Sequence, residues 1–333
     1  MGPSKGEVMA MVAVFGNLRP EDDLTHPPGP EPNYNESAYY NFFDREQGLG
    51  GFVRIGNRVN EGYAEVTLCL FLPQGDAVFN YLRPPISSND AFAAGGMRFE
   101  VLEPFRRHRT TYEGWAIYLA DPRALADPGQ AFRTSPRVEV HLDLVHDAIG
   151  PVYGTTAAER DVQDLERAFA RAHYEQHMRA TGVLVIDGQE HRLQALGLRD
   201  HSWGPRYWQA IPWYRWLTCS FGEDLGIMVN VTCRPDGSLV RHAVVVRGPE
   251  LLQRTDQVEL ESDHEEGTRY HRGMRANIHL EGEVIRLEGT VRGFVPLRNR
   301  RAGHVTHIGE AMTEYRWGQL VGLGISEYLD QIQ

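Results

Sequence analysis

Cysteine is scarce in this sequence: Cys69, Cys219 and Cys233 are the only three among 333 residues. Their number and wide spacing fit neither a disulfide framework nor a zinc knuckle. Each lies in an apolar run, where a free thiol usually packs as a small hydrophobic group. We therefore expect three buried thiols and no catalytic cysteine.

Motifs that bind nucleotides or build a serine hydrolase are also absent. The sequence contains no G-x-x-x-x-G-K-[ST] loop and no G-x-S-x-G elbow. The stretch GQLVGLGISEY at 318–328 is strand-like and precedes no helical pattern, so its glycines fit a bulge or a crowded barrel wall better than a phosphate site. ATP, NAD and serine-hydrolase chemistry are therefore disfavoured, and we expect no cofactor.

Positive charge is in deficit, since the formal net charge is −11. Nucleic acids and anionic membranes require a basic footprint, so neither is an expected partner. No stretch approaches the ~18 apolar residues of a membrane span. The opening residues MGPSKGEVMAMVAVFG also lack the basic start and long apolar core of a signal peptide. The sequence predicts a cytoplasmic protein without stable membrane insertion.

Alternation of polar and apolar residues, by contrast, is abundant. It is clear in GYAEVTLCLFL at 62–72 and recurs in many short runs bounded by Gly, Pro, Asn or Asp. These strands do not alternate with helices, which argues against a Rossmann or α/β-barrel architecture. The pattern predicts an all-β protein of two closed or nearly closed antiparallel barrels or sandwiches.

One segment breaks the strand pattern. In TTAAERDVQDLERAFARA, apolar residues recur at helical spacing, and Thr156 with Glu159 forms a capping box. The spacing predicts one amphipathic helix over 156–171. It would join a β domain at 36–155 to a second at 172–333, after an extended, proline-rich arm at 1–35.

The segment AHYEQHMR carries a candidate metal face. On a strand His173, Glu175 and His177 point to the same side, where two of them could bind a metal ion. The helical spacing of a zincin is missing. The alternative is a strand that carries polar groups into a lumen or out to solvent.

The segment GLRDHSWGPRYW at 197–208 combines charge and aromatic mass. Asp200 and His201 are adjacent, so on a strand they point to opposite faces. We expect one of them to face a cavity and the other to anchor the strand by hydrogen bonds. Two interpretations remain open: a buried carboxyl whose pKa is raised, placed in an aromatic cavity as a proton donor, or an aromatic core in which that carboxyl pairs with Arg199 or Arg206.

The same segment, GLRDHSWGPR, closely resembles the D-H-x-W-G signature of the AttH/hydroxyneurosporene synthase (carotenoid 1,2-hydratase) superfamily. HYEQHMRATGVLVIDG at 173–188 and GISEYLD at 324–330 look like the segments that flank this signature. The resemblance covers most of residues 170–333. Asp200, His201 and Trp203 are the positions that match the signature directly. It implies two lipocalin-like barrels, with the motif lining a ligand cavity at their interface. It also implies chemistry like that of members that hydrate isoprenoid chains or cyclise polyketide products.

Together these patterns predict a cofactor-independent acid–base enzyme, a lyase or isomerase. Its substrate would be an isoprenoid-, terpenoid- or steroid-like small molecule that is hydrated, dehydrated, isomerised or cyclised. Asp200 would be the acid, His201 would orient it or position water, and His173 and Glu175 would be second acid–base candidates. The predicted pocket residues are Trp203, Tyr207, Trp208, Trp213 and Tyr214. The alternatives are a non-catalytic carrier of an apolar ligand and a metal-dependent enzyme built on His173 and His177; the substrate, the direction of reaction and dimerisation stay open.

Overall fold

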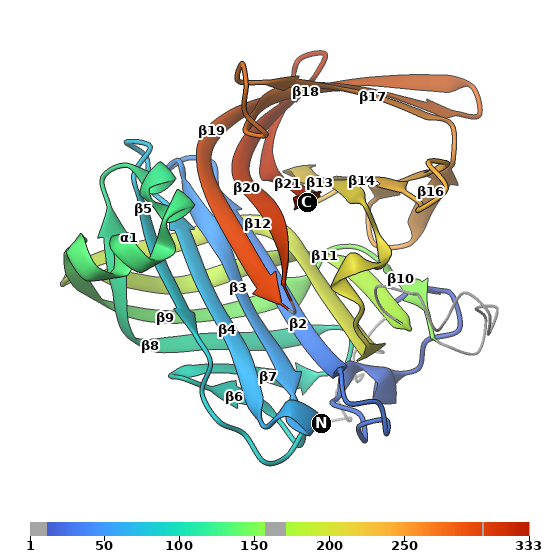
Figure 1. Ribbon diagram of the computed structural model, residues 1–333. Helices are drawn as coiled ribbons and strands as arrows, with labels where there is room; N and C mark the ends of the chain where they lie inside the picture. The colour runs from blue at the N-terminus through green and yellow to red at the C-terminus, as the bar shows by residue number, and fades with distance from the viewer. Residues whose placement is uncertain (1–11, 157–170, 302, 333) are drawn as a thin grey trace, which may run out of the picture.

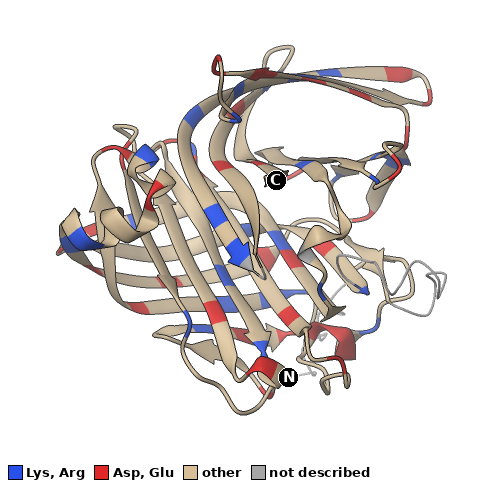
Figure 2. Cartoon of the chain, viewed as in Figure 1, with Lys and Arg blue, Asp and Glu red and all other residues tan. Residues whose placement is uncertain are grey.

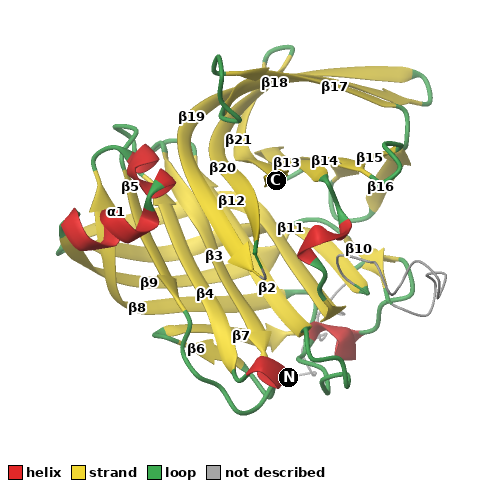
Figure 3. Ribbon diagram, in the orientation of Figure 1, coloured by secondary structure: helices red, strands yellow, loops and turns green. Residues whose placement is uncertain are grey.

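Strands dominate the fold (Figures 1 and 3). The computed structural model describes residues 12–156, 171–301 and 303–332. Two large antiparallel sheets account for most of these residues, which confirms the all-β prediction. The described helices are short: α1 (Pro128–Thr134) and the 3-10 turns η1 (Pro20–Asp23), η2 (Val59–Glu61), η3 (Pro122–Ala126) and η5 (Trp208–Ala210). The helix predicted over 156–171 lies, but for its end residues, outside the described residues.

The first sheet closes into a barrel. Its path runs β1-β10-β11-β12-β2-β3-β4-β5-β8-β7-β6, and β9 pairs with both β8 and β11, which joins the two arms of the path. The strands are β1 (Val14–Phe15), β2 (Tyr34–Asp44), β3 (Leu49–Arg58), β4 (Tyr63–Phe71), β5 (Ala77–Leu82), β6 (Phe92–Ala94), β7 (Met97–Glu103), β8 (Arg107–Leu119), β9 (Arg137–Ala148), β10 (Val152–Thr155), β11 (Ala172–Ile186) and β12 (Gln189–Pro205).

The second sheet has nine strands in the order β16-β15-β14-β13-β21-β20-β19-β18-β17. It curves over the first sheet in Figure 1. The strands are β13 (Trp213–Gly222), β14 (Leu225–Cys233), β15 (Leu239–Arg247), β16 (Leu251–Thr255), β17 (Val258–His264), β18 (His271–Leu280), β19 (Glu283–Arg301), β20 (His304–Trp317) and β21 (Leu320–Ile332).

Alternation along the strands divides the buried residues between the two faces of each sheet. On β2, Ala38, Tyr40 and Phe42 belong to the apolar core that fills the barrel. Tyr39 and Phe43, which alternate with them in sequence, point the other way and pack in a core shared with the second sheet. Both faces of β2 are therefore buried, and all three cysteines are buried as expected.

The boundary between the sheets does not coincide with the predicted domain boundary. Strands β11 and β12, which cover 172–205, pair with each other and with β9, β10 and β2 of the first sheet. The second sheet begins at Trp213, so 172–205 is part of the barrel rather than of a C-terminal domain starting at 172. Periodicity could not reveal this, because it identifies strands but not their partners.

The predicted arm at 1–35 is partly integrated into the barrel. β1 pairs in parallel with β10, and β2 begins at Tyr34.

Along the described ranges, no helix is long and apolar enough to cross a bilayer.

Candidate functional site

A cavity of about 1270 Å³ lies between the barrel and the second sheet. Strands from both sheets contribute to its wall, and most of its exposed surface is apolar. The aromatic lining residues are Tyr39, Phe52, Phe79, Tyr81, Phe132, Tyr214 and Trp216; the ionisable ones are Arg54, Glu65, Arg83, His173, Glu175, Asp200, Arg206, Arg234, Asp236, Arg298, Arg300, Glu310 and Glu327.

A single cross-strand row forms the barrel side of this cavity. Pairing registers place seven residues opposite one another on consecutive strands from β10 to β5: Tyr153, Glu175, Asp200, Tyr39, Arg54, Thr67 and Tyr81. Residues directly opposite in paired strands share one face of the sheet. This register brings Glu175 of β11 opposite Asp200 of β12, although the two residues are 25 positions apart in sequence.

His173, Glu175 and Asp200 form the polar centre of that face. The His173 imidazole Nε2 hydrogen-bonds Asp200 Oδ2 and lies 3.7 Å from Glu175 Oε1. Burial acts to raise the pKa of Asp200, but the charge of His173 and its hydrogen bond outweigh burial and hold that pKa below its usual value. Asp200 is therefore an ionised partner of His173, and the raised pKa expected for it is wrong.

The raised pKa belongs to Glu175. Its side chain is 3% exposed, and burial, with a further contribution from the charge of Asp200, raises the pKa of its carboxyl to about 7 despite the opposing effect of His173. The Trp216 indole Nε1 donates a 2.9 Å hydrogen bond to Glu175 Oε1 from the second sheet. Glu175 is thus a carboxyl that exchanges its proton near neutral pH, in the cavity wall.

A second carboxyl pair lies on the opposite wall. Glu310 of β20 and Glu327 of β21 are cross-strand neighbours, and Trp216 is opposite Glu327 on β13. Burial raises the pKa of both carboxyls, the charge of Glu327 adding to the effect on Glu310, and Tyr214 donates its hydroxyl to Glu327. Two adjacent buried carboxyls cannot both be ionised cheaply, so this pair retains a proton at neutral pH.

Metal-ligating atoms come together twice among the described residues. His173, Glu175 and Asp200 form one group, and His26, Glu36 and His201 form the other. His177 belongs to neither: its ring lies against Gly226 and its Nδ1 is 3.3 Å from Ser220 Oγ, at the contact between the sheets. The pair His173–His177 on which a metal enzyme would depend is therefore not brought together at the cavity.

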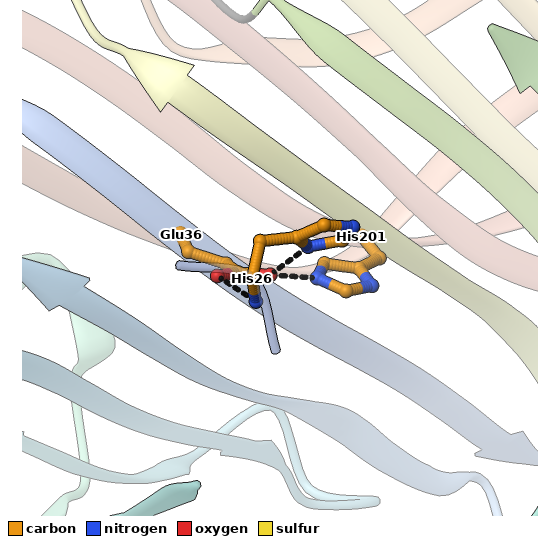
Figure 4. A group of neighbouring side chains, drawn as sticks. All are labelled: His26, Glu36 and His201. Carbon is orange, nitrogen blue, oxygen red and sulfur yellow. Dashed lines mark hydrogen bonds and ion pairs between the residues drawn. The ribbon is translucent and has the colours of Figure 1, made fainter. Parts of the chain in front are cut away.

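His201 lies on the barrel-interior face of β12, opposite to Asp200, and Figure 4 shows it beside His26 and Glu36. Its Nε2 is 2.9 Å from Glu36 Oε1, and the other ring nitrogen is 2.9 Å from the Tyr174 hydroxyl. Glu36 also binds the ring and backbone nitrogens of His26 and the amide of Asn89. These contacts anchor the loop that carries His26, so His201 is the anchoring member of the Asp-His pair and does not orient Asp200.

The predicted aromatic pocket is mostly elsewhere. Trp203 stacks on His26 at 4.0 Å, Trp213 packs beside Arg215, and Tyr207 is exposed, so none of these three described side chains lines the cavity. The side chain of Trp208 lies outside what the structure describes. Among the predicted residues whose side chains are described, Tyr214 alone contributes to the wall.

The alternative of an arginine partner for Asp200 is also corrected. Arg199 binds the buried Asp23 at 2.6 Å, inside the barrel. Arg206 lies on the cavity side and lowers the pKa of Asp200 through its charge, but the larger effect comes from His173. The main partner of Asp200 is therefore an imidazole rather than a guanidinium group.

Sequence reasoning missed Tyr39, Arg54, Trp216, Glu310 and Glu327 as site residues. A usable signal exists for the two glutamates, because each interrupts a strand of small and apolar residues, in IGEAM and ISEYL. A carboxylate in such a strand is costly to bury without a purpose or a partner. For Tyr39 and Arg54 no comparable signal exists, since their importance depends on the register of β2 and β3.

Comparison with solved structures supports the fold. The AttH-assigned protein of Nitrosomonas europaea has a TM-score of 0.63 at 14% identity, with all of both chains covered. CghA, solved with Sch210972, has a TM-score of 0.53 at 14% identity over 90% of this chain and 88% of its own. At these identities the likeness establishes a shared fold, which confirms at that level the resemblance to the AttH superfamily.

A search of curated proteins finds no match to this sequence. A family model, however, matches residues 19–332, which include every strand of both sheets except β1. The chain therefore belongs to the family described as a domain of unknown function, DUF7064.

Proposed function

We propose that this protein is a cofactor-independent acid–base enzyme acting on an isoprenoid-, terpenoid- or steroid-like molecule bound between its two sheets. The observation that carries the proposal is the combination, on one cavity wall, of the His173–Asp200 pair with Glu175, whose pKa is raised to about 7. General acid–base catalysis is most effective when the pKa of the catalytic group is near the working pH.

Asp200, His173 and Glu175 have different roles in this proposal. Asp200, kept ionised, holds the His173 ring, while His173 remains 36% exposed in its side chain and reaches the cavity. Glu175 supplies or accepts the second proton, and Trp216 fixes the position of its carboxyl. A proton donor and a proton acceptor side by side suffice to hydrate an alkene, eliminate water or move a double bond.

The apolar lining supports a hydrophobic substrate. Phe52, Phe79 and Trp216 offer ring faces, and an aromatic face stabilises a carbocation formed by protonation of an alkene. CghA, which shares the fold, was solved with Sch210972, and an organic ligand in that relative agrees with a small-molecule role here.

Deuterium incorporation tests the proposal even while the product is unidentified. The purified protein is incubated in D₂O with a panel of unsaturated isoprenoids and steroids, and carbon-bound deuterium is measured by mass spectrometry. Hydration, isomerisation and acid-initiated cyclisation each place a solvent proton on carbon. Wild type should label at least one compound, and Glu175→Gln and Asp200→Asn should each lower the rate by roughly 10²–10⁴-fold.

Glu288→Gln is the matched control, because Glu288 is exposed on β19, away from the cavity. It should label at the wild-type rate. A carrier would bind members of the panel and return them unlabelled and with unchanged mass, so binding with neither deuterium uptake nor loss of water would refute the enzyme and support the carrier.

A further inference from the structure

Arginine is concentrated at the cavity of a chain whose net charge is −11. Arg54 and Arg206 lie in the wall, and the exposed arginines Arg83, Arg234, Arg298 and Arg300 also border the space. Basic positions are visible in Figure 2 near the end of β19, the strand that carries Arg298 and Arg300. The exposed acidic lining residue is Asp236. The approach to the cavity is therefore basic although the molecule is acidic.

Arg54 has hydrogen-bonding capacity to spare. It is opposite Tyr39 in the row that contains Asp200, and its Nη1 is 3.5 Å from Glu65 Oε2. Its Nη2 is buried and has no hydrogen-bond partner. Glu65 is shared, because Arg58 and Arg83 approach its other oxygen at 3.4 and 3.6 Å. Glu65 is thus shared by three guanidinium groups, of which Arg58 also pairs with Glu61 at 2.6 Å.

Arg206 adds positive charge beside Arg54. It is 8% exposed and donates Nη2 to Ser202 Oγ at 2.8 Å. Burial and the charges of Arg54 and Arg58 lower the pKa of Arg206 to about 10, against the attraction of Asp200. The main partner of Asp200 is His173, and the raised pKa values of Glu175, Glu310 and Glu327 reduce the negative charge that these carboxyls present to the arginines at neutral pH.

We propose that the cavity binds an apolar molecule carrying a carboxylate, and that Arg54 and Arg206 hold this carboxylate. The planar guanidinium group matches a carboxylate, and a charge-assisted hydrogen bond in a desolvated site is stronger than a neutral one. The carboxylate would pair with the guanidinium groups of Arg54 and Arg206, while the chain of the ligand lies along Tyr39, Phe52 and Trp216. This inference rests on the proposed function for its cavity and names the class of substrate.

Two matched probes test it: farnesoic acid, which is ionised at about pH 7, and farnesol, which has the same chain and no charge. Their dissociation constants are measured by titration calorimetry with the whole protein. Wild type should bind the acid about tenfold or more tightly than the alcohol. Arg54→Gln should reduce this preference severalfold, because Arg206 remains, while leaving farnesol affinity within about twofold; Arg54→Lys should reduce the preference less than Arg54→Gln does.

Arg286→Gln provides the control, since it removes the same charge from an exposed position of β19 outside the cavity; its preference should equal that of wild type. Equal binding of the two probes by wild type, which needs no variant, would overturn the carboxylate site and leave the enzyme proposal standing. An undiminished preference in Arg54→Gln would overturn it equally. Failure of both probes to bind would instead contradict the apolar cavity itself, and the inference with it.

Discussion

Asp23 and Asp200 are the same residue type in different environments. Asp23 is buried and accepts hydrogen bonds from Arg199, Tyr174 and the backbone of Phe105, so it is part of the barrel interior. Asp200 lies on the other face of the same wall, with 20% of its side chain exposed and His173 as its partner. Burial and the nature of the partner, rather than residue type, separate the structural carboxylate from the one proposed to act in catalysis.

Replacement of each aspartate by asparagine should distinguish these roles. Asp23→Asn leaves the buried guanidinium of Arg199 without its counter-charge and should lower the free energy of unfolding by about 3–5 kcal/mol. Asp200→Asn leaves the imidazole of His173, which is partly exposed to solvent, and should cost less than about 1 kcal/mol. Urea denaturation near neutral pH measures both; equal losses would mean that Asp200 is also a structural ion-pair residue.

Glu175 should make stability depend on pH. Its folded-state pKa of about 7 exceeds the ordinary value of 4.5, so the native state retains a proton that the unfolded chain releases. Its contribution is fully present below pH 4.5 and is lost as the pH rises through 7, a change of about 3 kcal/mol. Glu175→Gln should therefore gain stability relative to wild type between about pH 5 and 8.

Denaturation curves at about pH 5 and pH 8 check this prediction. Glu288→Gln is the control, because its free energy of unfolding relative to wild type should be the same at both pH values. A constant difference for Glu175→Gln across the range would show that Glu175 ionises normally. In that case the acid–base role would need another residue.

At the scale of elements, β11 and β12 place the site. Together they carry His173, Glu175 and Asp200 to the outer face of the barrel and Tyr174 and His201 to its interior. Glycine makes close contact with the second sheet possible: a Cβ at Gly226 of β14 would lie 2.6 Å from the ring of His177 on β11.

Gly226→Ala should therefore force the two sheets apart. Overpacking of this kind costs about 1–3 kcal/mol, and the spacing of Trp216 from Glu175 should change with it. Gly222 of the neighbouring strand is the control, because a Cβ there meets nothing within 4 Å. Thermal unfolding of Gly226→Ala, Gly222→Ala and the double variant Gly226→Ala/His177→Ala measures the effect. An unchanged melting temperature for Gly226→Ala would contradict the tight contact.

The whole molecule is held together by a core that belongs to both sheets. Tyr39, Phe52 and Phe79 of the barrel pack in one cluster with Trp216 and Ile325 of the second sheet. Polar contacts cross the same boundary, from Trp216 to Glu175 and from Asn41 to Thr218. The cavity is a gap in this shared core, so its shape depends on both sheets.

We therefore expect one cooperative unfolding transition. Calorimetry, far-UV circular dichroism and tryptophan fluorescence should give coincident midpoints, because neither sheet can lose its partner without exposing the shared core. Two separated transitions would instead identify the barrel and the second sheet as independent domains.

The local pattern of the sequence determined the strands, the all-β class, the buried cysteines and the opposite orientations of Asp200 and His201. It also drew attention to His173 and Glu175. These features follow from alternation and composition, which act over neighbouring residues. Tertiary structure alone decided that β11 and β12 join the barrel, that Glu175 rather than Asp200 has the raised pKa, and that Arg54, Trp216, Glu310 and Glu327 share the cavity. Strand register and burial set these outcomes, and both depend on contacts between residues far apart in the chain.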